Sequence, residues 1–165
     1  MSIGRTFKEA LQKGLRSLEI GFTGLDDLKH PCNDEELKNK LRIPNASRIL
    51  YIKEAIKRGH TIDQINKMTR IDLWFLENIK EIVELEGKIK SELKLNQEKS
   101  SVDLLKKTKE FGFSDKQLAR LLNQSEEVIS KWRIGLGIKP EYKLVDTCAA
   151  EFEAFTPYFY STYES

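Results

Sequence analysis

The feature of this chain that most constrains its fold is a helical pattern that occurs twice. Residues 47–80 align with residues 100–133 without a gap, at a constant separation of 53 positions. Each copy has a helical stretch that ends at a glycine (Gly59 or Gly112), then a Thr or Ser cap, a short helix, a turn and a further capped helix. A repeated unit of this kind predicts two small helical subdomains related by duplication. The alternative is that any two helical hairpins with similar caps would align equally well.

Apolar positions of the two copies coincide in the same alignment, at the spacing of one helical face, and one pair of lysines coincides as well. The matched pairs are Ile49 with Val102, Ile52 with Leu105, Lys53 with Lys106, Ile65 with Leu118, Met68 with Leu121, Phe75 with Val128 and Ile79 with Trp132. A polar stretch without periodicity, residues 96–101, is the predicted linker between the copies.

The segments before the repeat are also predicted to be helical. A helix begins near Thr6 and ends by Gly21, because apolar residues recur between them at spacings of three and four. A second helix is capped by Asn33, with Glu36 completing a capping box, and ends at Pro44. The apolar face of the first helix consists of Phe7, Leu11, Leu15 and Leu18.

The last helix of the first copy is predicted to continue past the aligned region. Its apolar side consists of Phe75, Ile79, Ile82, Ile89 and Leu93. Its other side carries the pairs Glu84–Lys88 and Glu86–Lys90, and such pairs stabilise an exposed helix by roughly 0.2–0.5 kcal/mol each.

The last quarter of the chain fits neither a helical nor a strand pattern for more than a few residues. Seven of the 15 aromatic residues lie within 22 positions: Tyr142, Phe152, Phe155, Tyr158, Phe159, Tyr160 and Tyr163. Aromatic side chains at this density indicate a contact surface. We predict an extended arm in which Asp146 and Glu151 contact a lobe that this chain lacks.

The predicted fold class is therefore all-α and multihelical. Two small helical subdomains of similar topology are framed by an N-terminal helix and an extended C-terminal arm. The predicted boundaries are 1–21 for the N-terminal junction and helix, 22–97 for the first subdomain, 98–138 for the second and 139–165 for the aromatic arm.

Composition excludes several classes of protein. A net charge of +2 is too small to indicate a polyanion partner. No apolar run reaches the 18 residues of a membrane span, and the start lacks the apolar core of a secretion signal. The cysteines Cys32 and Cys148 are far apart in sequence, which favours a reducing, cytoplasmic setting.

No catalytic, cofactor-binding or metal site is predicted. The chain has no phosphate-binding loop, and the glycines at 135 and 137 are predicted to mark a helix terminus. His30 and Cys32 are two of the four ligands that a zinc site needs. His60 follows a helix C-terminus and has no evident partner for general-base chemistry. Cys148 has no nearby histidine and is expected to be a small packed side chain rather than a nucleophile.

The main alternative function is DNA binding through a helix-turn-helix. Residues 114–132 have the spacing of that motif, in which the start of the second helix contacts bases and phosphates. Here those positions are Glu126 and Glu127, with Asp72 in the first copy, and carboxylates repel phosphate. Helix capping explains these acidic residues better.

Stretches near the two ends of the chain resemble a known family. The sequences Tyr142-Lys, VDTCAAEF from Val145 and YSTYE from Tyr160 resemble the entry to the second synthetase half of the carbamoyl-phosphate synthetase large subunit. At the start, MSIGRT from Met1, EALQK from Glu9 and LRSLE from Leu15 resemble the end of that family's first ATP-grasp half. The two groups of motifs lie about 140 residues apart and bracket the oligomerisation (connection) domain.

The resemblance covers nearly the whole chain. Between about residues 22 and 135 the similarity lies in the spacing of the motifs, in Asp72 and in the residues from Trp74 to Leu76. The other residues of this region match less closely. A long run such as VDTCAAEF is much more specific than a spaced glycine pattern.

The resemblance implies a non-catalytic domain that links the two ATP-grasp halves of a glutamine-dependent ligase and contributes to subunit association. The implied partners are the two flanking halves, other large subunits and a glutaminase small subunit, with no nucleic acid and no membrane. ATP and Mg²⁺ are implied for the parent enzyme, not for this chain. The parent would serve arginine synthesis, pyrimidine synthesis or both.

Overall fold

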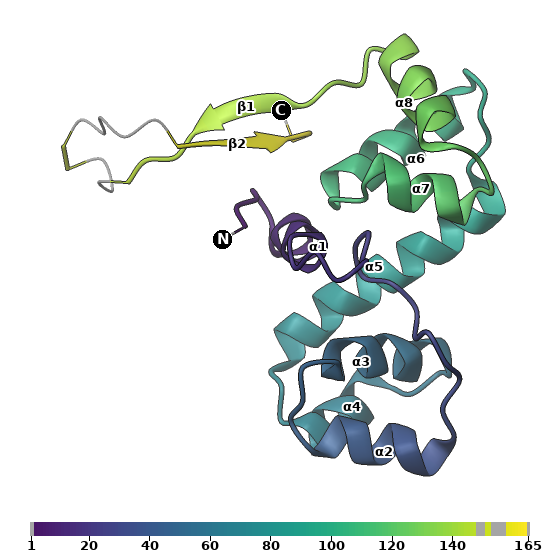
Figure 1. The fold of residues 1–165 in the computed structure, drawn as a ribbon, viewed down its shortest axis with the longest axis vertical. Helices are drawn as coiled ribbons and strands as arrows, with labels where there is room; N and C mark the ends of the chain where they lie inside the picture. Colours follow the sequence, from purple (N-terminus) through teal and green to yellow (C-terminus); the bar gives the residue numbers. More distant parts are fainter. Residues whose placement is uncertain (1, 148–150, 153–157, 165) are drawn as a thin grey trace.

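A computed structural model of the chain describes residues 2–147, 151–152 and 158–164. The predicted all-α, multihelical class is confirmed, with a small two-stranded sheet in addition (Figure 1). Within the described residues, no helix has the length and apolarity needed to cross a membrane.

The helices follow one another with short connections, except for the long loop of residues 17–33 between the first two. They are α1 (Phe7–Arg16), α2 (Asp34–Arg42), α3 (Arg48–Lys57), α4 (Ile62–Thr69), α5 (Leu73–Glu92), α6 (Lys99–Glu110), α7 (Asp115–Leu121) and α8 (Glu126–Gly135). The strands are β1 (Glu141–Leu144) and β2 (Phe159–Thr162).

The 20-residue helix α5 forms the axis of the molecule. Helices α3 and α4 pack against it and α2 packs on these two, which gives a lower group in Figure 1. Helices α6 and α7 contact α5 and α8 packs on α7, forming an upper group, while α1 packs on α5 between the groups. The buried apolar side chains form one cluster that includes residues of both groups.

The backbone repeats at the separation found in the sequence. Gly59 and Gly112 both have positive φ, of 83° and 85°. Two positions later, the hydroxyls of Thr61 and Ser114 cap α4 and α7 by accepting a hydrogen bond from the backbone of a glutamine three residues on. The two copies therefore share an order of elements and a set of caps, although α5 is twice as long as α8. The subdomain boundaries stay a prediction.

Two predicted helical faces need correction. Helix α1 ends at Arg16 with Ser17 as its C-cap, well before Gly21, so Leu18 lies beyond the helix and is 56% exposed. On α5 the predicted apolar side is buried except for Phe75, which is 43% exposed.

The predicted pairs on the other side of α5 are half correct. Glu86 pairs with Lys90 at 2.7 Å, but Glu86 is buried rather than solvent-facing. Glu84 lies nearest to Lys80, at 3.9 Å, instead of pairing with Lys88.

Asn33 caps α2 as predicted, by accepting a hydrogen bond from the Glu36 backbone. The predicted capping box is not completed, because the Glu36 carboxylate instead accepts a hydrogen bond from the Tyr51 hydroxyl, at 3.3 Å. Glycines 135 and 137 mark the end of α8, as predicted, with Gly137 at a φ of 73°.

The C-terminal arm contains an antiparallel hairpin that the sequence patterns did not predict. Strands β1 and β2 pair from Glu141 with Thr162 to Leu144 with Phe159. The hairpin projects from the helical body, and its last residues return towards α1 (Figure 1). Strands of four residues are too short to give a recognisable alternation.

Candidate functional site

The two ends of the described chain are joined on helix α1. The Glu9 carboxylate, only 2% exposed, accepts hydrogen bonds from the Arg5 backbone (2.8 Å) and the Thr162 hydroxyl (3.2 Å). The same carboxylate forms an ion pair with Lys13 one turn later, at 2.8 Å. Because a buried carboxylate is costly unless it is paired and hydrogen-bonded, these contacts fix both chain ends relative to α1.

Lys13 and a terminal ion pair complete this junction. The Lys13 ammonium donates hydrogen bonds to the carbonyl of Ile3, at 2.9 Å, and to that of Ser161. Arg5 and Glu164 form an ion pair at 3.3 Å. Segments near the two ends, residues 3–5 and 161–164, are therefore held on the same helix, although Glu9 and Thr162 are 153 positions apart in the sequence.

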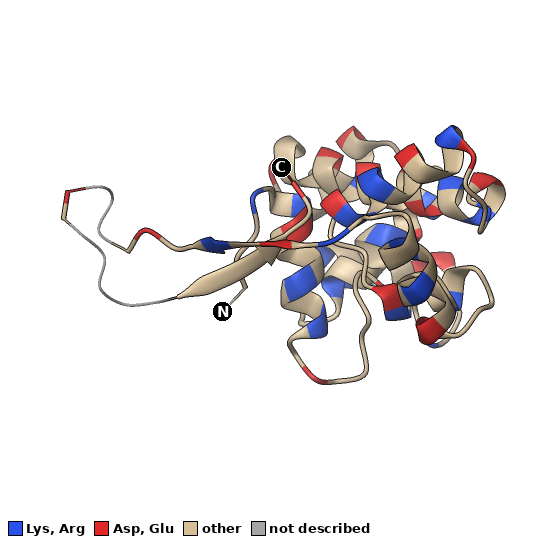
Figure 2. Ribbon diagram, turned by 90° about the horizontal axis from the view of Figure 1, so that it is seen from above, with Lys and Arg blue, Asp and Glu red and all other residues tan. Residues whose placement is uncertain are grey.

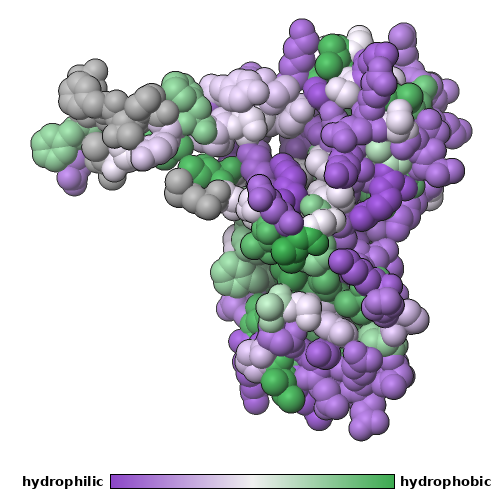
Figure 3. All heavy atoms as spheres, viewed as in Figure 1, coloured by the Kyte–Doolittle hydropathy of each residue, from purple (hydrophilic) through white to green (hydrophobic). Residues whose placement is uncertain are grey.

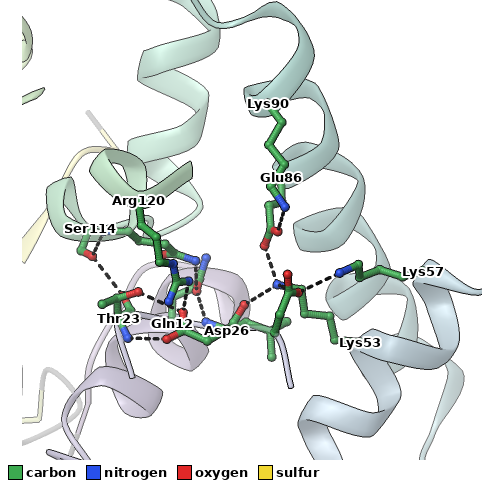
Figure 4. Close-up of polar contacts among 12 residues, drawn as sticks. Gln12, Thr23, Asp26, Lys53, Lys57, Glu86, Lys90, Ser114 and Arg120 are labelled. Carbon is green, nitrogen blue, oxygen red and sulfur yellow. Dashed lines mark hydrogen bonds and ion pairs between the residues drawn. The ribbon is translucent and has the colours of Figure 1, made fainter. Parts of the chain in front are cut away.

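A second polar network anchors the loop between α1 and α2 (Figure 4). Lys53 of α3 is 1% exposed and donates a hydrogen bond to the Leu25 carbonyl, at 2.8 Å. Its ammonium also forms ion pairs with Glu86 of α5 and with Asp27 of the loop. Burial disfavours the charged form of Asp27, but hydrogen bonds and charge from Lys53 and Lys57 outweigh it and lower its pKa to about 2.

The same loop is tied to the upper helical group. Asp26 accepts hydrogen bonds from the Thr23 backbone and hydroxyl, both at 2.9 Å, and from Arg120 of α7 at 2.6 Å. Ser114, the cap of α7, donates its hydroxyl to the Thr23 carbonyl at 3.0 Å. The loop therefore connects α3 and α5 with α7 through buried and half-buried polar contacts (Figure 4), which favours a fixed arrangement of the two groups.

Two glutamines lie fully buried where this loop crosses α1 and α7. Gln12 accepts the Leu25 backbone N–H at 2.7 Å, and the Gln117 amide lies 3.4 Å from the same oxygen. The remaining amide atoms, Gln12 Nε2 and Gln117 Oε1, have no hydrogen-bond partner among the described residues.

An exposed aromatic surface lies where α1 and α5 begin. It consists of the exposed Trp74 and Phe75 and the half-buried Phe7, whose ring centroids are 4.9 to 5.4 Å apart, a favourable range for aromatic pairs. Trp74 is 57% exposed although it lies in the first turn of α5. Hydrophobic side chains also gather near the middle of the face shown in Figure 3, between two largely hydrophilic ends. Exposed aromatic clusters of this kind mark contact surfaces.

The histidines and cysteines considered from the sequence do not converge. Arg58 donates hydrogen bonds to the Cys32 carbonyl, at 2.7 Å, and to its sulfur, at 3.4 Å. His30 is exposed, and His60 follows the Gly59 turn with its backbone N–H bonded to the Ala55 carbonyl. No group of three or more metal-ligand side chains occurs among the described residues.

Several predictions for the arm lie outside the described residues or stay untested. Cys148 and Phe155 fall in the undescribed part. Glu151 and Phe152 are exposed, and Asp146 has contacts of its own. The expected contact of Asp146 and Glu151 with another lobe stays a prediction.

Two packed helices match the helix-turn-helix alternative, but the charges at the start of the second helix are acidic and do not favour DNA binding. Helices α7 and α8 pack together, and Ser125 caps α8. Glu126 and Glu127 occupy its first turn, and Glu127 pairs with Lys131 at 2.7 Å. In Figure 2 acidic and basic residues are interspersed over the helices, whereas DNA binders concentrate positive charge on one face.

Sequence reasoning missed the buried charged residues. Glu9, Lys53 and Glu86 are polar positions on amphipathic helices, where side chains of this type normally face solvent. The repeat gave no signal for Lys53 either, because its aligned partner Lys106 is exposed.

The sequence matches the family model described as "Carbamoyl-phosphate synthetase large chain, oligomerisation domain" over residues 1–137. The carbamoyl phosphate synthase large chain of Archaeoglobus fulgidus is 48% identical over 167 residues, which cover 99% of this chain and 16% of the relative. The large chain, N-terminal section, of Aquifex aeolicus is 47% identical, covering 99% of this chain and 28% of the relative. The arginine-specific large chain of Arabidopsis thaliana, a chloroplastic protein, is 46% identical, covering 99% of this chain and 14% of the relative. The chain thus spans less than a third of the length of each of these relatives.

Proposed function

This chain belongs to the oligomerisation-domain family of the carbamoyl-phosphate synthetase large chain, and we propose that it is a non-catalytic connection domain. It links two flanking ATP-grasp halves of a parent subunit and contributes to the association of large subunits. The observation that carries this proposal is the junction of the chain ends on α1, held by Glu9 and Lys13.

The junction supports a particular mode of linkage. A connector whose ends lay far apart would separate the flanking parts by its own length. Here residues 3 to 5 and 161 to 164 contact each other or the same helix. Flanking parts attached at these points would therefore lie next to each other, with the helical body beside them.

The buried polar network supports a rigid connection. Its central pair, Lys53 with Glu86, is almost inaccessible to water, and removal of either partner from a buried pair is strongly unfavourable. A reactive intermediate passed between two active sites requires a fixed geometry, and a domain with few low-energy deformations provides it.

The remaining roles concern the parent enzyme. We propose that ATP and Mg²⁺ bind in the flanking halves and that a glutaminase subunit supplies ammonia to the first. The expected setting is the cytoplasm, and the expected product serves arginine synthesis, pyrimidine synthesis or both.

The exposed aromatic surface is the proposed contact surface of this domain in the assembly. Aromatic residues are enriched where protein surfaces bury one another. Its occupant is either a second copy of the domain or a flanking half, and these two differ in their effect on the mass of the isolated chain.

Light scattering behind size exclusion, over a roughly hundredfold range of concentration, tests the association. We expect a mass that rises from 19.1 kDa towards twice that value as concentration increases. Trp74→Asp is the informative variant, and Val128→Asp, at an exposed apolar position of α8, is its control. If only Trp74→Asp abolishes the dimer, the aromatic surface binds a second copy; if the dimer persists, a flanking half covers it. A constant 19.1 kDa for the wild-type chain would mean that the assembly contacts need the flanking halves, which would leave this domain mainly as a spacer.

A further inference from the structure

The hairpin of β1 and β2 carries apolar side chains on a face that is open to solvent. In the register of the strands Tyr142 lies opposite Ser161 and Leu144 lies opposite Phe159, so these four side chains share one face. Tyr142 is 72% exposed, Leu144 49% and Phe159 62%. We call these three side chains the open face of the hairpin.

The other face of the hairpin is mostly polar and lies against α1. Its side chains are those of Glu141, Lys143, Tyr160 and Thr162. The Thr162 hydroxyl donates to Glu9 of α1 at 3.2 Å, and the Lys13 ammonium lies 5.9 Å from the centre of the Tyr160 ring. An antiparallel sheet with one covered and one solvated face normally has its apolar residues on the covered face. The hairpin has the reverse arrangement, which indicates that a partner covers the open face.

The outer end of the hairpin also lacks support. It projects from the helical body (Figure 1), and the Val145 N–H continues the pairing by donating to the Tyr158 carbonyl at 2.7 Å. A two-stranded hairpin is marginally stable in water unless a further strand or another element packs against it. Among the described residues, the helices leave the three side chains of the open face exposed. The partner is therefore expected to stabilise the strand pairing as well as to bury these side chains.

We propose that the open face is a docking surface for an apolar patch on the synthetase half that follows the hairpin in the parent subunit. This inference rests on the proposed function, and it identifies the residues through which the domain contacts that half.

The position of the hairpin favours the following half as the occupant. Strand β2 ends at Thr162, which is bonded to Glu9 of α1. Two residues later Glu164 pairs with Arg5, just before α1, at 3.3 Å. A half attached after Glu164 therefore begins next to the base of the hairpin, with the open face within its reach.

The size of the open face argues against a second copy of the chain as the occupant. Stable interfaces between free partners involve roughly 20–30 residues on each side. The open face offers three large apolar side chains. A partner attached through the same chain needs fewer contacts, because the attachment gives it an effective concentration in about the millimolar range.

Hydrogen exchange of backbone amides, followed by mass spectrometry, tests the proposal. It is measured on peptides covering residues 141–145 and 158–162, in the 165-residue chain and in the whole large subunit that contains this domain. We expect these peptides to exchange at least about tenfold more slowly in the whole subunit, because docking suppresses opening of the hairpin. Peptides of α3, in the helical body, are the internal reference and should exchange alike in both.

Three variants of the whole subunit identify the face. Phe159→Thr and Leu144→Thr each remove an apolar side chain of the open face and keep a residue that favours strands, so we expect exchange to return towards the rate of the isolated chain. Glu141→Thr, on the other face of the same hairpin, is the matched control and should remain protected.

Three results would overturn the inference. They are equal exchange in the chain and the whole subunit, protection that survives both open-face variants, and protection in the isolated chain that rises with its concentration, which would identify a second copy as the occupant. None of these results would refute the proposed connection, because that proposal depends on the junction at α1 and not on the open face.

Discussion

Two glycines at equivalent positions of the repeat illustrate how much a single residue depends on its surroundings. Gly59 and Gly112 both have φ near 84°, a conformation that residues with a Cβ rarely adopt. A Cβ on Gly59 would meet nothing within 4 Å. A Cβ on Gly112 would lie 2.9 Å from the Cα of Glu9, because the turn between α6 and α7 packs directly on α1. A side chain would therefore strain the backbone at both positions, but it would clash with a neighbouring element only at Gly112.

We therefore expect Gly112→Ala to be more destabilising than Gly59→Ala. The left-handed conformation costs a residue with a Cβ about 1–2 kcal/mol, which applies to both variants. Displacement of the Glu9 backbone adds about 1–3 kcal/mol to Gly112→Ala alone. Urea unfolding followed by circular dichroism measures the difference, and equal losses would contradict the close packing of this turn on α1.

Among the elements, helix α5 contacts the other helices through a buried ion pair as well as through its apolar face. Glu86 of α5 meets Lys53 of α3 where both side chains are almost inaccessible to water. Glu86 also pairs with Lys90, and Lys53 also pairs with Asp27. The contact between α3 and α5 is thus specified by a particular pair of charges, and it also places the loop that carries Leu25.

Replacing Lys53 with Met should cost about 3 kcal/mol of unfolding free energy, near the lower end of the range for breaking a buried pair, because Lys90 still compensates Glu86. The double variant Lys53→Met with Glu86→Met should recover most of that loss, since a buried pair replaced by packed apolar groups is often neutral. Chemical denaturation of both single variants and the double variant gives the coupling energy. A double variant as unstable as the sum of the single variants would mean that the pair is not the dominant contact.

The whole molecule consists of two helical groups with one shared helix. Helix α5 packs in both groups, the α1–α2 loop is bonded to both, and the buried apolar side chains of the two groups form one cluster. Elements connected in this way are expected to unfold together.

The two tryptophans allow that expectation to be tested. Trp74 lies at the start of α5 in the lower group, and Trp132 of α8 in the upper group donates its indole N–H to the Asn96 carbonyl at 3.0 Å. In Trp132→Phe the fluorescence reports the lower group, and in Trp74→Phe it reports the upper group. We expect the fluorescence and circular dichroism midpoints to coincide within each variant. A fluorescence midpoint displaced from the helical midpoint would identify two independently stable units.

Much of the fold could be predicted from local patterns. The caps Thr6, Asn33, Thr61 and Ser114, the glycine turns and the order of the helices depend on residues within a few positions of each other, so the sequence displays them directly. The hairpin escaped prediction because its strands are short and its stability depends on pairing across the arm. Periodicity alone assigned Phe75 to the core. In the structure it is exposed at the start of α5, where its ring packs on Phe7 and Trp74.

The features of the candidate site also divide into those that the sequence shows directly and those that depend on the tertiary structure. The resemblance of the two end motifs indicated the family, because long runs of identical residues need no structure to be recognised. The sequence could not place Glu9 beside Thr162 or Lys53 beside Glu86, because these contacts join residues 153 and 33 positions apart. By itself the sequence determined the helices, their caps, their repetition and the family. Only the tertiary structure decided which charges are buried and that segments near both chain ends meet on α1, because burial and electrostatic pairing depend on long-range packing.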